Sequence, residues 1–165
     1  MNLGRIARHL VQHHWRVRQV FPPPVLERIG QAIRQGETTH AGQVRFVVEG
    51  TLGDAALLRG QPARERALEV FSQLRIWDTE RNNGVLIYLL LADRDVEIVA
   101  DRGIHAQVGD AVWAAICRAM QAEFTCGAFE RGVIGGVEAV SRELARHFPP
   151  CDLQRNELPD EPVVL

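Results

Sequence analysis

The chain has 165 residues, of which 46% are hydrophobic and 24% are charged, and its formal net charge is −2. This length and composition favour one globular domain with a substantial core. The slightly negative charge argues against a general nucleic-acid binder, because contacts with phosphates require a basic surface.

The cysteines and the N-terminal residues indicate a cytoplasmic protein. Cys117, Cys126 and Cys151 form no CxxC motif, so a reducing compartment is expected rather than a zinc ribbon or a disulfide scaffold. The N-terminus has neither the apolar core nor the cleavage site of a secretory signal. No stretch has the ~20 apolar residues that a membrane span requires. We therefore expect the protein in the cytoplasm or at the surface of the inner membrane.

Residues 1–20 predict a basic amphipathic helix. Leu3, Ile6 and Leu10 recur at helical spacing among several arginines, and the run Phe21-Pro22-Pro23-Pro24 ends the pattern. Such a helix can pack on its own domain, or it can lie on the surface and touch anionic lipid or an acidic partner. The sequence leaves both alternatives open.

Residues 21–148 form the predicted domain, in which helices and strands alternate. The predicted helices carry apolar stripes and span residues 24–37, 62–74 and 110–124, with a last helix that ends near residue 147. The predicted strands span residues 43–49, 85–91 and 96–100. In the first strand, Val44, Phe46 and Val48 should point to one face and Val47 to the other. The tail, residues 149–165, is polar, and we expect it to be mobile or to lie on the surface.

This order of elements predicts a three-layer α/β/α sandwich around a small mixed β-sheet. A helix joins the first two strands, which should therefore lie parallel through a right-handed crossover. The short turn Asp93-Arg94-Asp95 joins the second and third strands, which should pair as an antiparallel hairpin. The strand at residues 85–91 has no charged residue, as expected at the centre of a sheet that is covered on both faces.

The block from Asn82 to Asp110 resembles the TPM domain family. It contains Asn82-Asn83-Gly84-Val85-Leu86, the uncharged strand, the charged turn, a second strand and then Gly103-Ile104. The resemblance covers residues 21–147 and implies the same α/β/α sandwich. The family includes a thylakoid acid phosphatase and many bacterial proteins of unknown role. Many members carry a signal and a membrane anchor, for which this sequence offers no candidate.

Acidic residues follow or precede several of the predicted strands. Asp78, Asp93, Asp95 and Asp101 lie near strand ends, where open α/β sheets bind ligands, and Asp110 opens a helix after one of these loops. Carboxylates that converge there can hold a hard divalent cation. Taken singly, each of these residues is also an ordinary turn or cap residue.

The family resemblance implies more specific ligands. TPM domains commonly show Gly-hydrophobic-Glu and an Asp five residues after the Glu. Here Gly103-Ile104 match, His105 stands in place of the Glu, and Asp110 matches the Asp. Imidazole is a poor ligand for calcium and suits zinc or manganese better. The candidate metal ligands, for Ca, Mg, Mn or Zn, are His105, Asp110, Asp101 and Asp78.

Two functions are compatible with these residues. The first is a non-catalytic binding or assembly module of the TPM type with a degenerate metal site and a protein partner associated with the membrane. The alternative, implied by the resemblance, is a divalent-metal-assisted acid phosphatase in which His105 and Asp110 are the candidate catalytic residues. In that case His105 would act as a general acid or base. The replacement of an acid by His105 favours the binding module.

Overall fold

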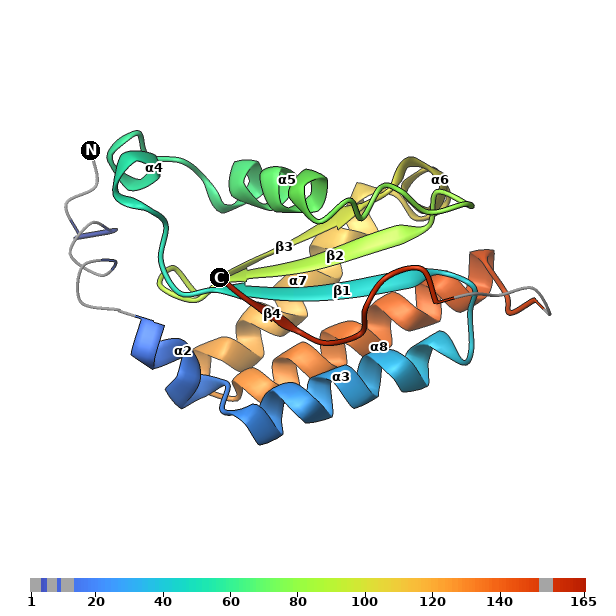
Figure 1. Cartoon of the computed structure of the whole chain (residues 1–165), viewed down its shortest axis with the longest axis horizontal. Coiled ribbons are helices and arrows are strands. Elements are labelled where there is room, and N and C mark those ends of the chain that lie inside the picture. Colours follow the sequence, from blue (N-terminus) through green and yellow to red (C-terminus); the bar gives the residue numbers. More distant parts are fainter. Residues whose placement is uncertain (1–3, 6–8, 10–13, 152–155) are drawn as a thin grey trace.

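A four-stranded mixed sheet forms the middle layer of the molecule in the computed structural model, which describes residues 4–5, 9, 14–151 and 156–165 (Figure 1). Its strands are β1 (Gln43–Glu49), β2 (Gly84–Leu90), β3 (Asp95–Ala100) and β4 (Val163–Val164). Their order is β3-β2-β1-β4. Strand β1 runs parallel to β2 and β4, whereas β2 and β3 are antiparallel. The parallel pair and the hairpin are those that the sequence predicted.

Helices cover both faces of this sheet, which confirms the predicted three-layer sandwich (Figure 1). The first face carries α2 (His14–Val20), α3 (Pro23–Glu37), α7 (Asp110–Thr125) and α8 (Phe129–His147). The second face carries α4 (Asp54–Leu58) and α5 (Ala63–Gln73). The short helix α6 (Arg102–Val108) links β3 to α7. The layered arrangement gives the protein two separate hydrophobic cores.

Alternation along β1 divides its side chains between these two cores. Val44, Phe46 and Val48 lie in the larger core with α3, α7 and α8, and Val47 lies in the smaller core with α5. All four side chains are at most 1% exposed. The predicted assignment of faces is therefore confirmed, and it follows from the two-residue period of a strand.

The turn that precedes β2 depends on two glycines where backbones approach closely. A Cβ at Gly84 would collide with the carbonyl oxygen of Ile76, and a Cβ at Gly103 would collide with that of Asn82. The turn and the start of α6 thus fit together without room for side chains. This close approach explains physically why Asn82-Asn83-Gly84 and Gly103 occur together in the block that resembles the TPM family.

Three elements of the structure were not predicted. Helix α4 lies between the predicted strand at residues 43–49 and the helix predicted from residue 62, and α6 lies between the predicted strand at residues 96–100 and the helix predicted from residue 110. The third element is β4, whose two residues pair with Val47 and Val48 of β1. All three are short, and an element of few residues does not show the repeat of apolar positions by which a helix or strand is recognised in a sequence.

The described part of the tail is held against the β1 edge by several hydrogen bonds. The side-chain oxygen of Gln43 accepts from the backbone N–H groups of Glu157 at 2.8 Å and Leu158 at 2.9 Å. The guanidinium of Arg45 donates to the backbone carbonyls of Pro159 and Glu161. Leu158 is buried in the smaller core. The tail therefore forms one side of the sheet in this structure.

Half of the predicted helix at residues 1–20 lies outside the described residues. Within its described part, Arg5 Nε donates to Asp93 Oδ2 at 2.7 Å, and His9 Nε2 lies 3.3 Å from Asp93 Oδ1. His9 Nδ1 also accepts from the backbone N–H of Leu52 at 3.2 Å. These contacts join the segment to the β2–β3 turn and to the loop between β1 and α4. No helix among the described residues is long and apolar enough to cross a membrane.

Candidate functional site

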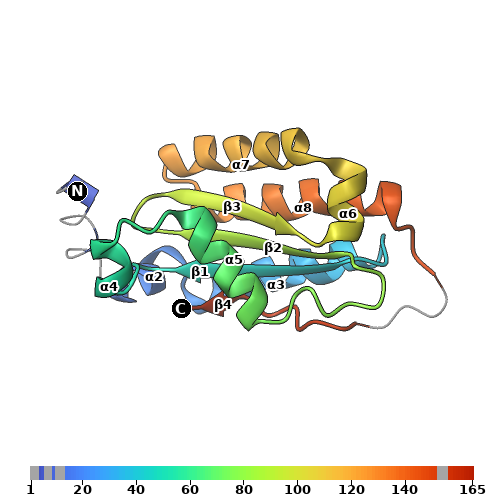
Figure 2. The ribbon, with the colours of Figure 1, turned by 90° about the horizontal axis from the view of Figure 1, so that it is seen from above.

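A groove of about 350 Å³ lies between the edge strand β3 and helix α7, and we call it the β3–α7 groove. Figure 2 shows α7 alongside β3 at one edge of the sheet, with β4 at the opposite edge. The polar and aromatic residues that line the groove include Arg64, Asp95, Glu97, His105, Asp110 and Trp113. The groove thus brings together residues that are distant in the sequence.

Helices α6 and α7 position the two residues on which the family resemblance depends. Asp101 caps α6, because its Oδ1 accepts from the backbone N–H of Arg102 at 2.7 Å. Gly109 then separates the helices with a φ of 82°, and Asp110 opens α7. As a result His105 Nε2 lies 3.8 Å from Asp110 Oδ1. The side chain of Asp110 is 93% exposed and that of His105 is 42% exposed, so this contact is open to water.

The four predicted metal ligands do not form one cluster. His105 and Asp110 meet at the groove, but Asp101 is 6% exposed and acts as a helix cap. Asp78 lies in the loop after α5 and pairs with Arg75 at 2.7 Å, outside the lining of the groove. Within the described ranges, no three His, Cys, Asp or Glu side chains are placed to hold a metal ion together. The donor set in this part of the chain therefore does not fit a complete metal site.

Asp95 and Glu97 give the groove its acidic character. Burial raises the pKa of Asp95 above its usual range, and Asp93 raises it further, although Gln121 Nε2 donates to Asp95 Oδ1 at 3.0 Å and opposes this. Burial also raises the pKa of Glu97, and Asp95 adds to that rise. Two partly buried carboxylates on one strand therefore repel each other, and a cation placed near them would be favoured.

Residues of the groove other than His105 and Asp110 were outside the predicted site. Asp95 was considered as a residue near a strand end, whereas Arg64, Glu97 and Trp113 belong to elements that come together only in the folded chain. The available signal was the alternation of Asp95, Val96, Glu97 and Ile98, which places both acids on one face of β3.

A second polar group lies in the interior on the α5 side of the sheet. The hydroxyl of Tyr88 donates to Glu49 Oε2 at 2.6 Å, and Arg66 contacts both oxygens of Glu49, at 2.8 and 3.1 Å. Burial raises the pKa of Tyr88, and the hydrogen bond with Glu49 raises it further, so the phenol stays protonated. The group is fully hydrogen-bonded and nearly enclosed, which assigns it to the stability of the fold.

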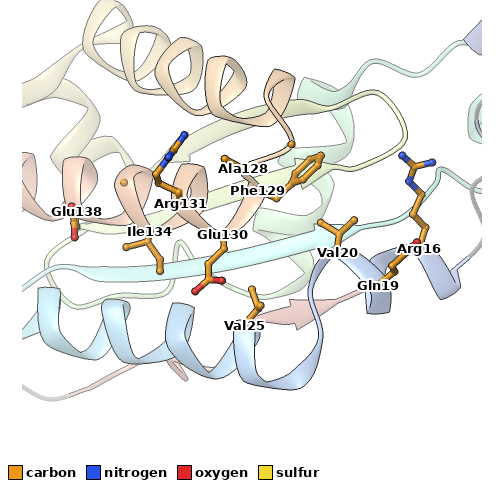
Figure 3. Close-up of a pocket in the computed structure, with 12 residues that line it drawn as sticks. Arg16, Gln19, Val20, Val25, Ala128, Phe129, Glu130, Arg131, Ile134 and Glu138 are labelled. Atoms are coloured by element: carbon orange, nitrogen blue, oxygen red, sulfur yellow. The ribbon is translucent and has the colours of Figure 1, made fainter.

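A second cavity lies between α2, the start of α3 and α8, and has a volume of about 940 Å³. Figure 3 shows Val20, Val25 and Ile134 around this space, with Glu130 between α8 and α3. Glu130 accepts from Arg28 at 2.9 Å, which joins α8 to α3. The lining of the cavity mixes apolar residues with charged ones.

The fold and the residues around the β2–β3 hairpin define the class to which the chain belongs. A mixed four-stranded sheet lies between two helical layers, and an Asn-Asn-Gly turn packs against a capped helix that carries His105. The model of the TPM domain matches residues 17–143. The chain therefore belongs to the TPM domain family.

Solved structures agree with this assignment. The NMR structure of the BA42 protein from the psychrophilic bacterium Bizionia argentinensis is 31% identical, with a TM-score of 0.76, and the match covers 86% of this chain and 93% of that one. The solution NMR structure of the N-terminal domain of a protein from P. gingivalis is similar in fold. It is 22% identical with a TM-score of 0.65, and the match covers 80% of this chain and 83% of that one. No curated protein matches the chain.

Proposed function

We propose that this TPM domain is a non-catalytic binding module that engages a protein partner through the β3–α7 groove. The observation that carries this proposal is the pair formed by His105 and Asp110, which stands at the mouth of the groove without a third metal-ligating side chain in the described part of the chain. Calcium takes ~6–8 oxygen ligands, and imidazole suits it poorly. The groove is better suited to recognition than to metal chemistry.

The basic N-terminal segment offers a second contact surface for the same partner. Arg18 of α2 is exposed, and Arg5 already contacts an acidic residue, Asp93, on its own domain. A surface with this charge suits a partner located at a membrane with anionic lipids. We propose a membrane-associated protein partner, met from the cytoplasmic side.

The alternative function is metal-assisted hydrolysis of phosphomonoesters, and the contact between His105 and Asp110 favours it. Histidine can exchange a proton near neutral pH, and a neighbouring carboxylate can orient its ring. In this alternative, both residues would be needed for turnover. The distance of 3.8 Å between His105 Nε2 and Asp110 Oδ1 supports this alternative, which requires the pair to tighten to a hydrogen bond when substrate binds.

Hydrolysis of a generic aryl phosphate separates the two functions. Wild type and Asp110→Asn would be assayed with calcium, magnesium, manganese and zinc in turn. We expect both proteins to match the buffer blank with every metal. Asp78→Asn is the matched control, because Asp78 is an exposed acid outside the groove. Metal-dependent turnover that Asp110→Asn loses while Asp78→Asn retains it would refute the binding module and establish the phosphatase.

A further inference from the structure

The outer side of β3 presents backbone groups to the β3–α7 groove. Asp101 N–H donates to the carbonyl of Gly84 at 2.9 Å, and Leu86 lies opposite Val99 in the register. Hydrogen bonding alternates along an antiparallel pair, so Val96 and Ile98 direct their N–H and C=O groups away from β2. No strand pairs with this side of β3 in the described part of the chain. The backbone N–H of Val96 contacts the side chain of Asp95, and that of Ile98 contacts the side chain of Cys117. A ligand in the groove therefore meets a sheet edge that side chains, rather than a strand, partly cover.

A guanidinium already occupies one position along this edge. Arg64 Nη1 donates to the carbonyl of Ile98 at 2.6 Å and lies 3.5 Å from Glu97 Oε2. The side chain of Arg64 is 47% exposed, so the contact is made at the rim rather than in the interior. Arg64 thus shows how a cationic side chain is recognised here, by a strand carbonyl and a carboxylate at once.

The remaining carboxylates of the groove exceed its cations. Asp95 and Asp110 line the groove together with Glu97, whereas Arg64 is the one arginine in the lining and no lysine occurs in it. Asp95 receives a hydrogen bond from Gln121, which is neutral, and Asp110 is almost fully exposed. The charge of the groove is therefore complementary to a positively charged ligand.

Trp113 has an indole N–H that needs a hydrogen-bond acceptor, which a simple cation cannot provide. Its side chain lines the groove, the residue is 5% exposed, and its Nε1 has no hydrogen-bond acceptor among the described residues. A buried indole N–H normally has an acceptor. A metal ion cannot accept a hydrogen bond from this N–H, and a protonated amine has only hydrogen-bond donors. A peptide offers both cationic side chains and backbone carbonyls.

We propose that the β3–α7 groove binds a short extended peptide segment that carries lysine or arginine. The inference rests on the proposed function and names the chemistry of its partner. The cationic side chains would pair with Asp95, Glu97 and Asp110, and a backbone carbonyl would accept from Trp113. Lying beside an edge strand is a common way for a domain to recognise an extended segment.

Fluorescence anisotropy with the full chain tests this proposal. The probe is a short labelled peptide in which lysine alternates with threonine, and the comparison peptide has glutamate in place of lysine. We expect binding of the lysine peptide alone, with affinity reduced about tenfold or more in the double variant Asp95→Asn, Glu97→Gln. Arg64→Ala should raise the affinity, because it removes the internal competitor. Glu138→Gln, in the α2–α8 cavity, is the matched control and should bind like wild type.

Two further binding measurements, one with the variant Trp113→Phe and one with spermine as the ligand, distinguish a peptide from a small polyamine. Trp113→Phe keeps most of the side-chain volume and removes the N–H, so it should weaken the lysine peptide while circular dichroism shows an intact fold. Binding of spermine as tight as that of the lysine peptide, and unchanged in Trp113→Phe, would overturn the proposal in favour of a small polyamine. Absence of binding by either peptide would also overturn it. The aryl phosphate assay tests the proposed function separately, because its result does not depend on whether the peptide binds.

Discussion

The two edges of the sheet differ in what covers them. At the β1 edge the chain supplies its own strand, β4, and secures it with Gln43 and Arg45, which are 0% and 7% exposed. At the β3 edge no strand is added within the described residues, and side chains such as Arg64 approach the backbone instead. Exposed edges invite pairing with other chains, and both solutions limit it. The difference teaches that the β1 edge is closed by backbone pairing, whereas the β3 edge is covered by side chains, which can move aside more easily than a paired strand.

Removal of residues 156–165 should have the largest effect, because it turns the covered edge into an open one. The side chains of Gln43 and Arg45 would lose their partners and become exposed to water. The buried side chain of Leu158 and the pairing of β4 with Val47 and Val48 would also be lost. Burial of one leucine contributes about 2 kcal/mol and each hydrogen bond about 1 kcal/mol, so we expect a loss of about 4 kcal/mol in the free energy of unfolding. Urea unfolding measures it. A truncated protein within about 1 kcal/mol of the full chain would mean that the tail contributes little to the sheet.

Glu37→Gln should reveal a pH dependence that is specific to the covered edge. Burial raises the pKa of Glu37 to about 8 from its ordinary 4.5, and Asp160 of the tail raises it further, while the N–H of Val44 opposes the rise. The pKa of Glu37 is higher in the folded state than in the unfolded state. The contribution of protonated Glu37 to the free energy of unfolding is therefore fully present below pH 4.5 and is lost as the pH rises through about 8.

We therefore expect Glu37→Gln to gain about 2 kcal/mol relative to wild type between pH 5 and pH 9. Unfolding curves at both pH values measure this difference. Glu27→Gln, at an exposed position of the same helix, should show none. Parallel pH profiles for wild type and Glu37→Gln would contradict the raised pKa.

Asp101→Ala should have an intermediate effect at the other edge. The side chain caps α6 directly after β3, and loss of such a cap costs about 1 kcal/mol. Its second oxygen, Oδ2, is buried without a hydrogen-bond partner among the described residues, which keeps the cost from being larger. Asp101→Asn should recover most of the loss, since it retains an acceptor oxygen. Thermal unfolding measures both variants, and equal losses would exclude capping as the cause.

Arg64→Ala should have the smallest effect on stability, about 0.5 kcal/mol, because the pair with Glu97 is long and partly exposed. It should nevertheless change the behaviour of the open edge, since the carbonyl of Ile98 loses its covering donor. We expect self-association at high protein concentration, detected by light scattering. Arg75→Ala, which breaks an exposed pair away from the sheet edge, is the control. Equal scattering by both variants would refute a protective role for Arg64.

The same contrast between edges explains what could be predicted from the sequence. The parallel strands and the hairpin were predictable because Val44, Phe46 and Val48 alternate with other residues along 43–49, and because residues 85–91 are apolar over a whole strand. Strand β4 was not, because its two residues depend on pairing with Val47 and Val48 rather than on any local pattern. Local chemistry predicts elements that are long enough to show a period, and tertiary pairing supplies the others.

The candidate site was predictable to a smaller extent. His105 and Asp110 were expected to lie together, and the positive φ of Gly109 allows the two helices that carry them to do so. Asp101 and Asp78 were expected beside them, but the first is turned toward the start of α6 and the second toward Arg75. The contribution of Trp113 could not be foreseen, since it arises from the packing of α7 against β3.

The reactivity of Cys117 toward thiol reagents can report on the opening of the β3 edge. The side chain of this residue lies in the lining of the β3–α7 groove, and burial raises the pKa of its thiol to about 11, with Glu97 raising it further. Cys126 and Cys151 are exposed. Alkylating reagents attack the thiolate, so they should modify the exposed pair quickly and Cys117 slowly. In a variant with Cys126 and Cys151 replaced by serine, only Cys117 can be labelled. Its labelling rate then measures how often α7 separates from β3, and the measurement requires no attached dye.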